Sequence, residues 1–285
     1  MPTLTVCRNL HSNWSILNAS SDSEVCRFAA EELQRYLKLL SGCLLPIQDK
    51  LREEDVFLVG LRRDIPATDR QNIPVPAEGF DGYAISINER SICIAGDNER
   101  GVLYGVYDLL ERLGCRWFYP MQDPKDPEVV PKLDAVSFET GTWSIASPIP
   151  IRLCNASSFF FEIVPEIMRT QLDVAMKARY NGMAWQCDHR SPVGDQYREM
   201  ERAGIIDEIK KRGMLFHGPA HSFQHFLRDD DYFESHPEWF GMRDGKRVHQ
   251  VYGGSQFCWS NSQARRQFVL NAERFVLDCP ALDIF

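Results

Sequence analysis

The sequence contains no apolar run near 18 residues, so no transmembrane helix is predicted. Its start, MPTLTVCRNLHSNWS, lacks a basic stretch followed by an apolar one, so no signal peptide is visible. We therefore expect a cytoplasmic protein with no membrane partner, or an exported protein whose leader has been trimmed. The net charge of −8 argues against a general nucleic-acid binder, which needs a basic surface, and suits a small substrate or a sugar better.

Paired cysteine motifs are also absent. The nine cysteines are an odd number, are widely scattered and include no CxxC pair. This pattern predicts reduced, mostly buried thiols and neither a disulfide framework nor a zinc site. The glycosylation sequons at Asn13, Asn18 and Asn155 carry little weight under that expectation.

Motifs for phosphate binding and nucleophilic catalysis are missing. The glycines at positions 96, 101 and 105 fit neither GxGxxG nor a P-loop, because no GK[ST] follows. No GxSxG elbow exists, and no cysteine is accompanied by a histidine partner motif. We therefore expect no nucleotide cofactor, no other cofactor and no thiol nucleophile.

The first part of the chain predicts a small α/β sandwich domain over residues 1–142. The clearest helix has a capping box of Ser21 and Glu24 and a stop at Gly42. DVFLVG reads as a buried strand, and YAISI and SICIA form a hairpin around NER. A second helix, ERGVLYGVYDLLERLG, ends at Gly114. Helices packed against one sheet would bury these apolar stripes.

Beyond a proline-rich connector, residues 143–285 alternate strands with helices. The predicted strands are IPIRLCN, NGMAWQCD, MLFHGPAH and ALDIF. The predicted helices between them are VPEIMRTQLDVAMKARY, which opens at Pro165, QYREMERAGIIDEIKKRG and SNSQARRQFVLNAERFVLDC. Strand–helix units at this spacing predict a parallel sheet.

Two architectures compete for this parallel sheet. An open doubly wound sheet often carries a glycine-rich loop after its first strand, and RLCNASSFF has none. A (β/α)8 barrel needs about 250 residues, whereas only about 140 remain. We therefore predict the first part of a TIM-type barrel in a truncated chain. A hairpin insertion at about 230–256 is expected to turn at Asp244-Gly245.

Three histidines, His217, His221 and His225, are spaced four apart and would share one face of a helix, as in zinc-binding helices. Gly218-Pro219 breaks such a helix. His217 is then expected at the carboxyl end of the third strand and His221 in the following loop. We therefore predict no metal at this stretch.

Polar residues at the carboxyl ends of barrel strands line active sites, and this rule selects the candidate sugar-binding residues. They are Arg152, Trp185, His217, His221, Trp259 and Asn261. Arg152 in an apolar strand needs a carboxylate partner or an anionic ligand. Trp259 would stack on a sugar or anchor a loop, and Trp185 would equally suit the core. Asp188 and His189 read as a solvated loop pair.

The segment GVLYGVYDLLERLGCRWFYP, with the helix before it, resembles the N-terminal domain that precedes the barrel in family 67 alpha-glucuronidases. A related domain precedes the barrel in family 20 hexosaminidases. The later HSFQHFL, YFESHPEWFGMRDGKR and QFCWSN segments are similar to a large, mainly bacterial group of uncharacterised barrel proteins. Arg152 matches the family 20 arginine that holds the sugar at the end of the first strand, and His221 lies in the H-x-F segment of that group.

The resemblance implies a glycoside hydrolase that acts on oligo- or polysaccharide, with alpha-glucuronidase-like activity one option. It places the catalytic carboxylates on strand four or later, so we expect them beyond residue 285 and expect this chain alone to be inactive. Asp283 is too early in that strand to be one of them. The alternatives are a non-catalytic carbohydrate-binding barrel and, less favoured, a metal-dependent hydrolase using Asp188, His217 and His221. The oligomeric state is left open.

Overall fold

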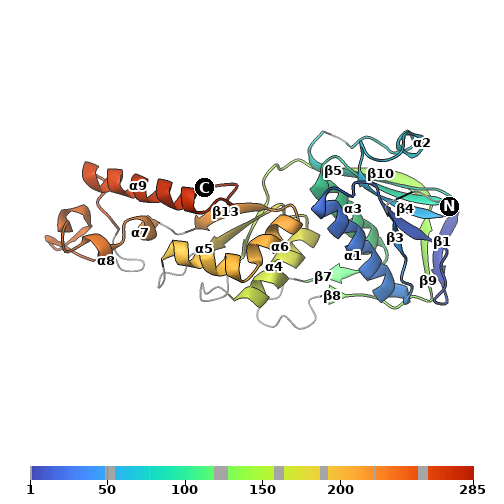
Figure 1. The fold of residues 1–285 in the computed structure, drawn as a ribbon, viewed down its shortest axis with the longest axis horizontal. Coiled ribbons are helices and arrows are strands. Elements are labelled where there is room, and N and C mark those ends of the chain that lie inside the picture. The colour runs from blue at the N-terminus through green and yellow to red at the C-terminus, as the bar shows by residue number, and fades with distance from the viewer. Residues whose placement is uncertain are drawn as a thin grey trace. The chain divides into compact units, whose positions relative to one another are not determined.

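The computed structural model describes residues 2–48, 50, 55–76, 78–118, 128–156, 164–186, 192–220, 223–249 and 256–285. The chain forms two compact units (Figure 1). Unit 1 comprises Met1–Arg152, Thr170–Asn181 and Ile209–Met214, and unit 2 comprises Leu153–Arg169, Gly182–Glu208 and Leu215–Phe285. Within the described ranges, no helix combines the length and the apolar character needed to cross a membrane.

Unit 1 is built on a six-stranded mixed sheet with the order β10-β5-β6-β4-β2-β3. The strands are β2 (Ser15–Asn18), β3 (Ile47–Gln48), β4 (Val56–Leu61), β5 (Phe80–Ile87), β6 (Ser91–Gly96) and β10 (Gly141–Ser147). β3, β2, β4 and β6 run parallel, and the predicted β5–β6 hairpin is confirmed as an antiparallel pair. Two-stranded pairs join β1 (Thr3–Arg8) to β9 (Ala135–Glu139) and β7 (Arg116–Trp117) to β8 (Glu128–Val129).

Two helices, α1 (Glu24–Ser41) and α3 (Glu99–Arg112), pack against each other and against the sheet (Figure 1). Apolar residues along one stripe of α1 are buried, as expected for a helix that packs against a sheet: Val25, Phe28, Ala29, Leu33, Tyr36, Leu37 and Leu40. The segment around the short α2 (Ala67–Arg70) contributes Ile65 and Ile73 to an apolar cluster that also contains residues of β2, β4, β5 and β6. Every residue of β4 is buried, as expected for a central parallel strand.

The ends of α1 agree with the prediction at one end only. Gly42 adopts a left-handed φ of 77° and ends the helix, as predicted. The capping box of Ser21 and Glu24 is wrong, because the helix begins at Glu24 and Ser23 is its N-cap. The Ser23 hydroxyl accepts a hydrogen bond of 3.2 Å from the backbone N–H of Cys26.

A disulfide joins Cys7 in β1 to Cys43, one residue past the glycine that ends α1. The expectation that the cysteines are all reduced is therefore wrong. The two residues are 36 positions apart in sequence, and only the fold brings them together, so no local motif shows the pair. The other described cysteines are free and five of the six are buried: Cys26, Cys93, Cys115, Cys154 and Cys279, with Cys258 partly exposed.

The carboxylate of Asp81, at the start of β5, is a buried charged group of unit 1 that accepts hydrogen bonds from four side chains. Its side chain is 2% exposed. Oδ1 accepts hydrogen bonds from Asn98 Nδ2 (2.7 Å) and Arg100 Nε (2.9 Å). Oδ2 accepts hydrogen bonds from Arg152 Nη2 (2.6 Å) and Asn181 Nδ2 (2.9 Å). Burial alone would raise the pKa of this carboxyl, but the hydrogen bonds from Asn98 and Arg152 and the charge of Arg100 lower it below its ordinary value.

A second buried charge in unit 1 is the ammonium of Lys177, whose side chain is 1% exposed. Its Nζ donates to the Tyr36 hydroxyl (2.7 Å) and pairs with Asp173 and with Glu128, the latter at 3.7 Å. It also lies within 6 Å of three aromatic ring centroids: those of Tyr36, Tyr107 and Trp117. Ion pairs and cation–π contacts together offset the desolvation of this cation.

Unit 2 contains a parallel sheet of β11 (Leu153–Ala156), β12 (Gly182–Gln186) and β13 (Leu215–Ala220) in that spatial order. A parallel bridge from His217 to Ile284 extends the pairing to the last residues of the chain. Strands that neighbour each other in chain order are typical of a (β/α)8 barrel, whereas a doubly wound sheet reverses its order near the middle. The predicted α/β class and barrel-type strand order are confirmed.

The longer helices follow the predicted alternation with one correction. They are α4 (Pro165–Lys177), α5 (Val193–Arg202), α6 (Ile205–Lys211) and α9 (Ser262–Asp278). The single helix expected across residues 196–213 is wrong, because Gly204 adopts a left-handed φ of 71° and separates α5 from α6. Parts of α4 and α6 belong to unit 1, since that unit includes Thr170–Asn181 and Ile209–Met214.

Short elements make up the described part of the insertion after β13, residues 223–249. These are α7 (Phe223–Phe226), α8 (Asp229–Tyr232), a 3-10 turn (Pro237–Trp239), β14 (Met242–Arg243) and β15 (Lys246–Arg247). β14 and β15 form an antiparallel hairpin, and both connecting residues have positive φ, Asp244 at 49° and Gly245 at 75°. The predicted type I′ turn is confirmed.

The disulfide predicts the thiol count of the protein. Denatured, unreduced protein should expose at most seven thiols to Ellman's reagent, and nine after reduction, because two of the nine cysteines are bridged. In the chain-entropy treatment, closing a loop of this length stabilises the folded state by about 4 kcal/mol. Reduction should therefore lower the urea concentration at which half of the protein is unfolded. Nine reactive thiols without reductant would contradict the bridge.

The Asp81 network predicts a pH-dependent stability. The pKa of Asp81 is lower in the folded protein than in the unfolded chain, where it is near 4. Its charged form therefore stabilises the folded state fully above pH 4. This stabilisation is lost as the pH falls through the folded pKa. Asp81→Asn should lower the free energy of unfolding at pH 7 by about 3 kcal/mol, because Arg100 and Arg152 lose their buried counter-charge. Urea unfolding at pH 7 and pH 3 should show a smaller difference between the two pH values for the variant than for the wild type. Equal differences would contradict this role.

Candidate carbohydrate-binding site

The sheet of unit 2 has two chemically different faces. On one face, Trp185 packs with its ring centroid 5.2 Å from that of Phe216 and 6.5 Å from that of Phe275 on α9. Tyr197 of α5 stacks on Phe216 from the same side, at 6.2 Å. Successive residues of a strand point to opposite faces of the sheet. The strand neighbours of Trp185 and Phe216 therefore lie on the other face.

That other face carries a row of residues in direct register. Asn155 of β11 is paired with Ala184 of β12, and Ala184 is paired with His217 of β13. We call these three residues the polar row. Asn155 is exposed, and Ala184 and His217 are partly exposed. In a closed barrel such a row faces the interior.

The polar row suits a hydroxyl-rich ligand. The Asn155 amide both donates and accepts hydrogen bonds. His217 Nδ1 lies 2.6 Å from the carbonyl oxygen of Gly218, which can only accept, so the proton of a neutral His217 is on Nδ1 and Nε2 is an acceptor. Between the two polar groups, Ala184 carries only a methyl group.

Two exposed aromatic residues follow β13 in the sequence. Phe223 at the start of α7 is 46% exposed and Trp259 is 48% exposed, and their ring centroids are 5.5 Å apart. Both rest on Phe268 of α9, Phe223 by stacking at 5.3 Å. We call Phe223 and Trp259 the aromatic ledge. Large exposed rings held by a packed layer beneath can stack on the apolar face of a sugar.

Arg152 does not occupy its predicted place. It precedes the first residue of β11, so the expectation that it lies at the carboxyl end of the first strand is wrong. Its guanidinium donates to Asp81 and to the carbonyl oxygen of Arg179 (2.8 Å). The sequence required a carboxylate or an anionic ligand for this buried cation, and the structure supplies the carboxylate.

The other predicted residues fall into different environments. Trp185 is buried on the helix-covered face, and Asn261 caps α9, its Oδ1 accepting from the N–H groups of Gln263 and Ala264 at 3.0 Å. Trp259 belongs to the aromatic ledge. His221 lies outside the described residues, as do Asp188 and His189, and their roles stay predictions.

The prediction that His217 and His225 do not lie on one continuous helix is confirmed. His217 is the third residue of β13, which continues through Gly218-Pro219 to Ala220, so its expected place at the strand end is wrong. His225 belongs to α7. In the ranges that the structure describes, no three His, Cys, Asp or Glu side chains are grouped to hold a metal ion.

Sequence reasoning missed Asn155, which it treated only as a glycosylation sequon. The period of two along a strand places Asn155 on the face opposite Cys154, and the register pairs it through Ala184 with His217. The alternation was visible in the sequence. The register was not, because it depends on how three separate strands align.

Residues 3–109 match the family model described as "Glycosyl hydrolase family 67 N-terminus". The chain is 34% identical over 110 residues to "Probable alpha-glucuronidase A" of Aspergillus fumigatus (strain CBS 144.89 / FGSC A1163 / CEA10), covering 37% of this chain and 13% of that protein. It is 32% identical over 107 residues to the protein of the same name from Aspergillus oryzae, with the same coverage. The predicted resemblance of the N-terminal domain is confirmed.

Solved structures resemble the fold of nearly the whole chain. The N-acetyl-beta-hexosaminidase of Streptomyces plicatus matches with a TM-score of 0.61 and 13% identity, over 98% of this chain and 54% of that one. The GH20 beta-N-acetylhexosaminidase of Streptomyces coelicolor A3(2) matches with a TM-score of 0.59 and 14% identity, over 98% and 55%. At this identity the likeness shows the fold. The chain spans 13% of the length of the curated relatives that it matches and about half of these solved chains.

Proposed function

We propose that this chain provides the N-terminal domain and the first barrel strands of a glycoside hydrolase, and that carbohydrate binds at the polar row. One observation carries the proposal. A region that matches the family 67 N-terminal domain is joined, in one chain, to parallel strands in barrel order, and one face of these strands presents Asn155 and His217. Alpha-glucuronidase activity is the finer proposal, supported by the relatives at 34% identity.

The polar row is proposed to bind and orient the sugar. Sugar hydroxyls both donate and accept hydrogen bonds, and the Asn155 amide with His217 Nε2 supplies matching partners. The aromatic ledge would add stacking against the apolar face of a second sugar ring. Glycosidases transfer protons and stabilise charge through two carboxylates, and the row contains none, so its role is positioning.

A non-catalytic carbohydrate-binding barrel is the second candidate. The observation that favours it is the composition of the polar row, an amide, a methyl group and an imidazole, which binds hydroxyls without offering an acid and a nucleophile. Binding without release of sugar would support this candidate over the hydrolase.

Calorimetric titration of the purified chain tests the proposal. The ligands are oligosaccharides with terminal alpha-glucuronic acid and N-acetylglucosamine oligomers, with sugar release followed in parallel. Ala184→Leu fills the gap between Asn155 and His217 and should weaken binding by about tenfold or more, equivalent to about 1.4 kcal/mol. His217→Ala should also weaken binding, because it removes an acceptor.

The matched control is Ala67→Leu, the same substitution at an exposed position of α2 in unit 1, which should leave binding unchanged. Thermal unfolding of each variant checks that the fold is intact. Absence of binding to every oligosaccharide, or unchanged affinity in a folded Ala184→Leu variant, would contradict the proposed site.

A further inference from the structure

The chain passes from unit 1 to unit 2 at three places, and each of them leads into a parallel strand. β11 begins directly after Arg152, and β12 begins directly after Asn181. β13 begins two residues after Gly213. Arg152, Asn181 and Gly213 all belong to unit 1, and we call them the entry residues. Residues of unit 1 therefore precede each strand of the three-stranded sheet.

The three entry residues are joined to one buried carboxylate, that of Asp81. Its Oδ2 atom accepts hydrogen bonds from Arg152 Nη2 (2.6 Å) and Asn181 Nδ2 (2.9 Å). Its Oδ1 atom accepts one from Arg100 Nε (2.9 Å), and Arg100 Nη1 donates to the carbonyl oxygen of Gly213 (3.0 Å). Two entry residues thus bind Asp81 directly, and the third is linked to it through Arg100.

The entry residues of β11 and β12 also bind each other. The backbone N–H of Arg152 donates to Asn181 Oδ1 (2.7 Å), and the backbone N–H of Asn181 donates to the carbonyl oxygen of Arg152 (3.0 Å). Asn181 and Asp81 are buried, so water competes little for these bonds. The backbone of Asp81 has a left-handed φ of 52°, which few non-glycine residues adopt, so its surroundings hold it in place.

Pairing between the three strands begins in register directly after the entry residues. Leu153 of β11 pairs with Gly182 of β12, and Gly182 pairs with Leu215 of β13. The polar row lies two residues farther along each strand. A strand that slips by one residue moves its side chains to the opposite face of the sheet. A slip at the start of β11 or β13 would therefore remove Asn155 or His217 from the row.

We propose that Asp81 is a positioning residue for the polar row. Through the entry residues, its carboxylate sets where β11, β12 and β13 begin relative to one another, and this keeps the row aligned. The use of the row for sugar binding rests on the proposed function, whereas the alignment of the strands does not. Asp81 lies in the region that matches the family 67 N-terminal domain, so this region takes part in building a site that it does not contain.

Hydrogen–deuterium exchange of the purified chain, followed by mass spectrometry, tests this inference. Asp81→Asn removes the charge but keeps the shape of the side chain, and asparagine tolerates a left-handed backbone. Peptides that cover β11, β12 and β13 should exchange about tenfold faster in this variant, because the strands lose a shared charged anchor at their amino ends.

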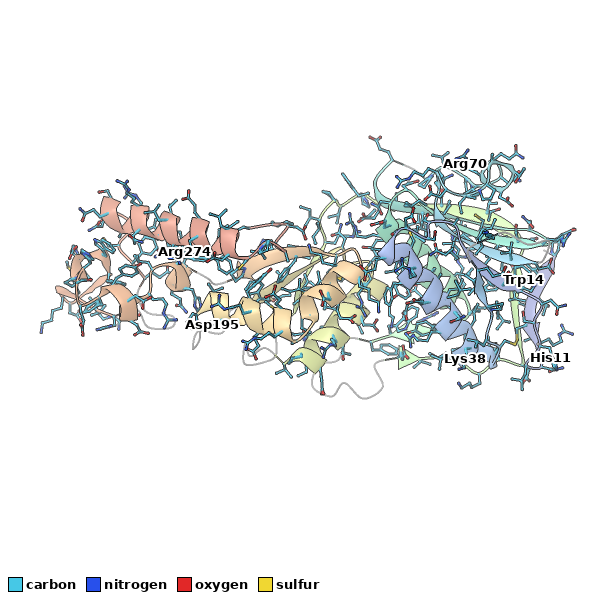
Figure 2. The ribbon with its side chains drawn as sticks, viewed as in Figure 1. His11, Trp14, Lys38, Arg70, Asp195 and Arg274 are labelled. Carbon is cyan, nitrogen blue, oxygen red and sulfur yellow. A yellow bond between two sulfur atoms is a disulfide. The ribbon has the colours of Figure 1, made fainter. Side chains whose placement is uncertain are left out.

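The matched control is Glu32→Gln, which also replaces a buried carboxylate of unit 1 by an amide. Glu32 lies on α1, the helix on which Figure 2 labels Lys38, and its carboxylate binds Arg35 and Tyr107. This variant should speed exchange in α1 and leave the three strands unchanged. Equal acceleration of the strands by both variants would indicate a general loss of stability and would overturn the inference.

Arg100→Gln keeps the inference testable if Asp81→Asn does not fold. The Arg100 side chain is 25% exposed, and it links Asp81 to Gly213, the entry residue of β13. Its loss should therefore accelerate exchange in β13 more than in β11 or β12. Equal acceleration of the three strands, or no acceleration of β13, would contradict the proposed link.

Calorimetric titration with the oligosaccharides named above separates this inference from the proposed function. If the wild-type protein binds sugar, Asp81→Asn should weaken binding by about tenfold, and Glu32→Gln should not. Unchanged affinity in a folded Asp81→Asn variant would refute the positioning role. Selective exchange in the strands of a protein that binds no sugar would refute the proposed function and support the alignment by Asp81.

Discussion

The first unit depends on the hydrogen bonds and ion pairs that surround the buried carboxylate of Asp81. A carboxylate removed from water is unfavourable unless donors surround it, and Asp81 receives hydrogen bonds on both oxygens from four side chains. These donors come from the start of α3, from Arg152 and from Asn181, which are distant in sequence. The network therefore explains why unit 1 includes residues well beyond its six-stranded sheet.

The second unit depends on a different constraint, the alternation of its strands. At alternate positions of the strands, apolar residues face α5 and α9 and pack against them. The positions between them, which face the other side of the sheet, hold Asn155, Ala184 and His217. One face of the sheet thus offers groups for hydroxyls, and the opposite face forms part of the core under the helices. The aromatic ledge adds an apolar surface.

Much of the fold could be predicted because its signals are local. The α1 stripe, the β5–β6 hairpin, the turn at Asp244-Gly245 and the strand–helix alternation each depend on a few consecutive residues. The motif around α3 carried the resemblance to the family 67 N-terminal domain for the same reason.

The features that could not be predicted depend on distant partners. Cys7 meets Cys43 across 36 residues, and Arg152 meets Asp81 across 71. The sequence showed that Arg152 needs an anion, but it could not show which one. Asn155 was overlooked because strand register, and not composition, aligns it with His217.

The central claim is that sugar binds over the polar row of unit 2. A crystal structure of the protein with a bound oligosaccharide tests it most directly. Sugar hydroxyls are expected within about 3 Å of His217 Nε2 and of the Asn155 amide. An ordered sugar bound elsewhere, with Asn155 and His217 covered by other protein side chains, would contradict it.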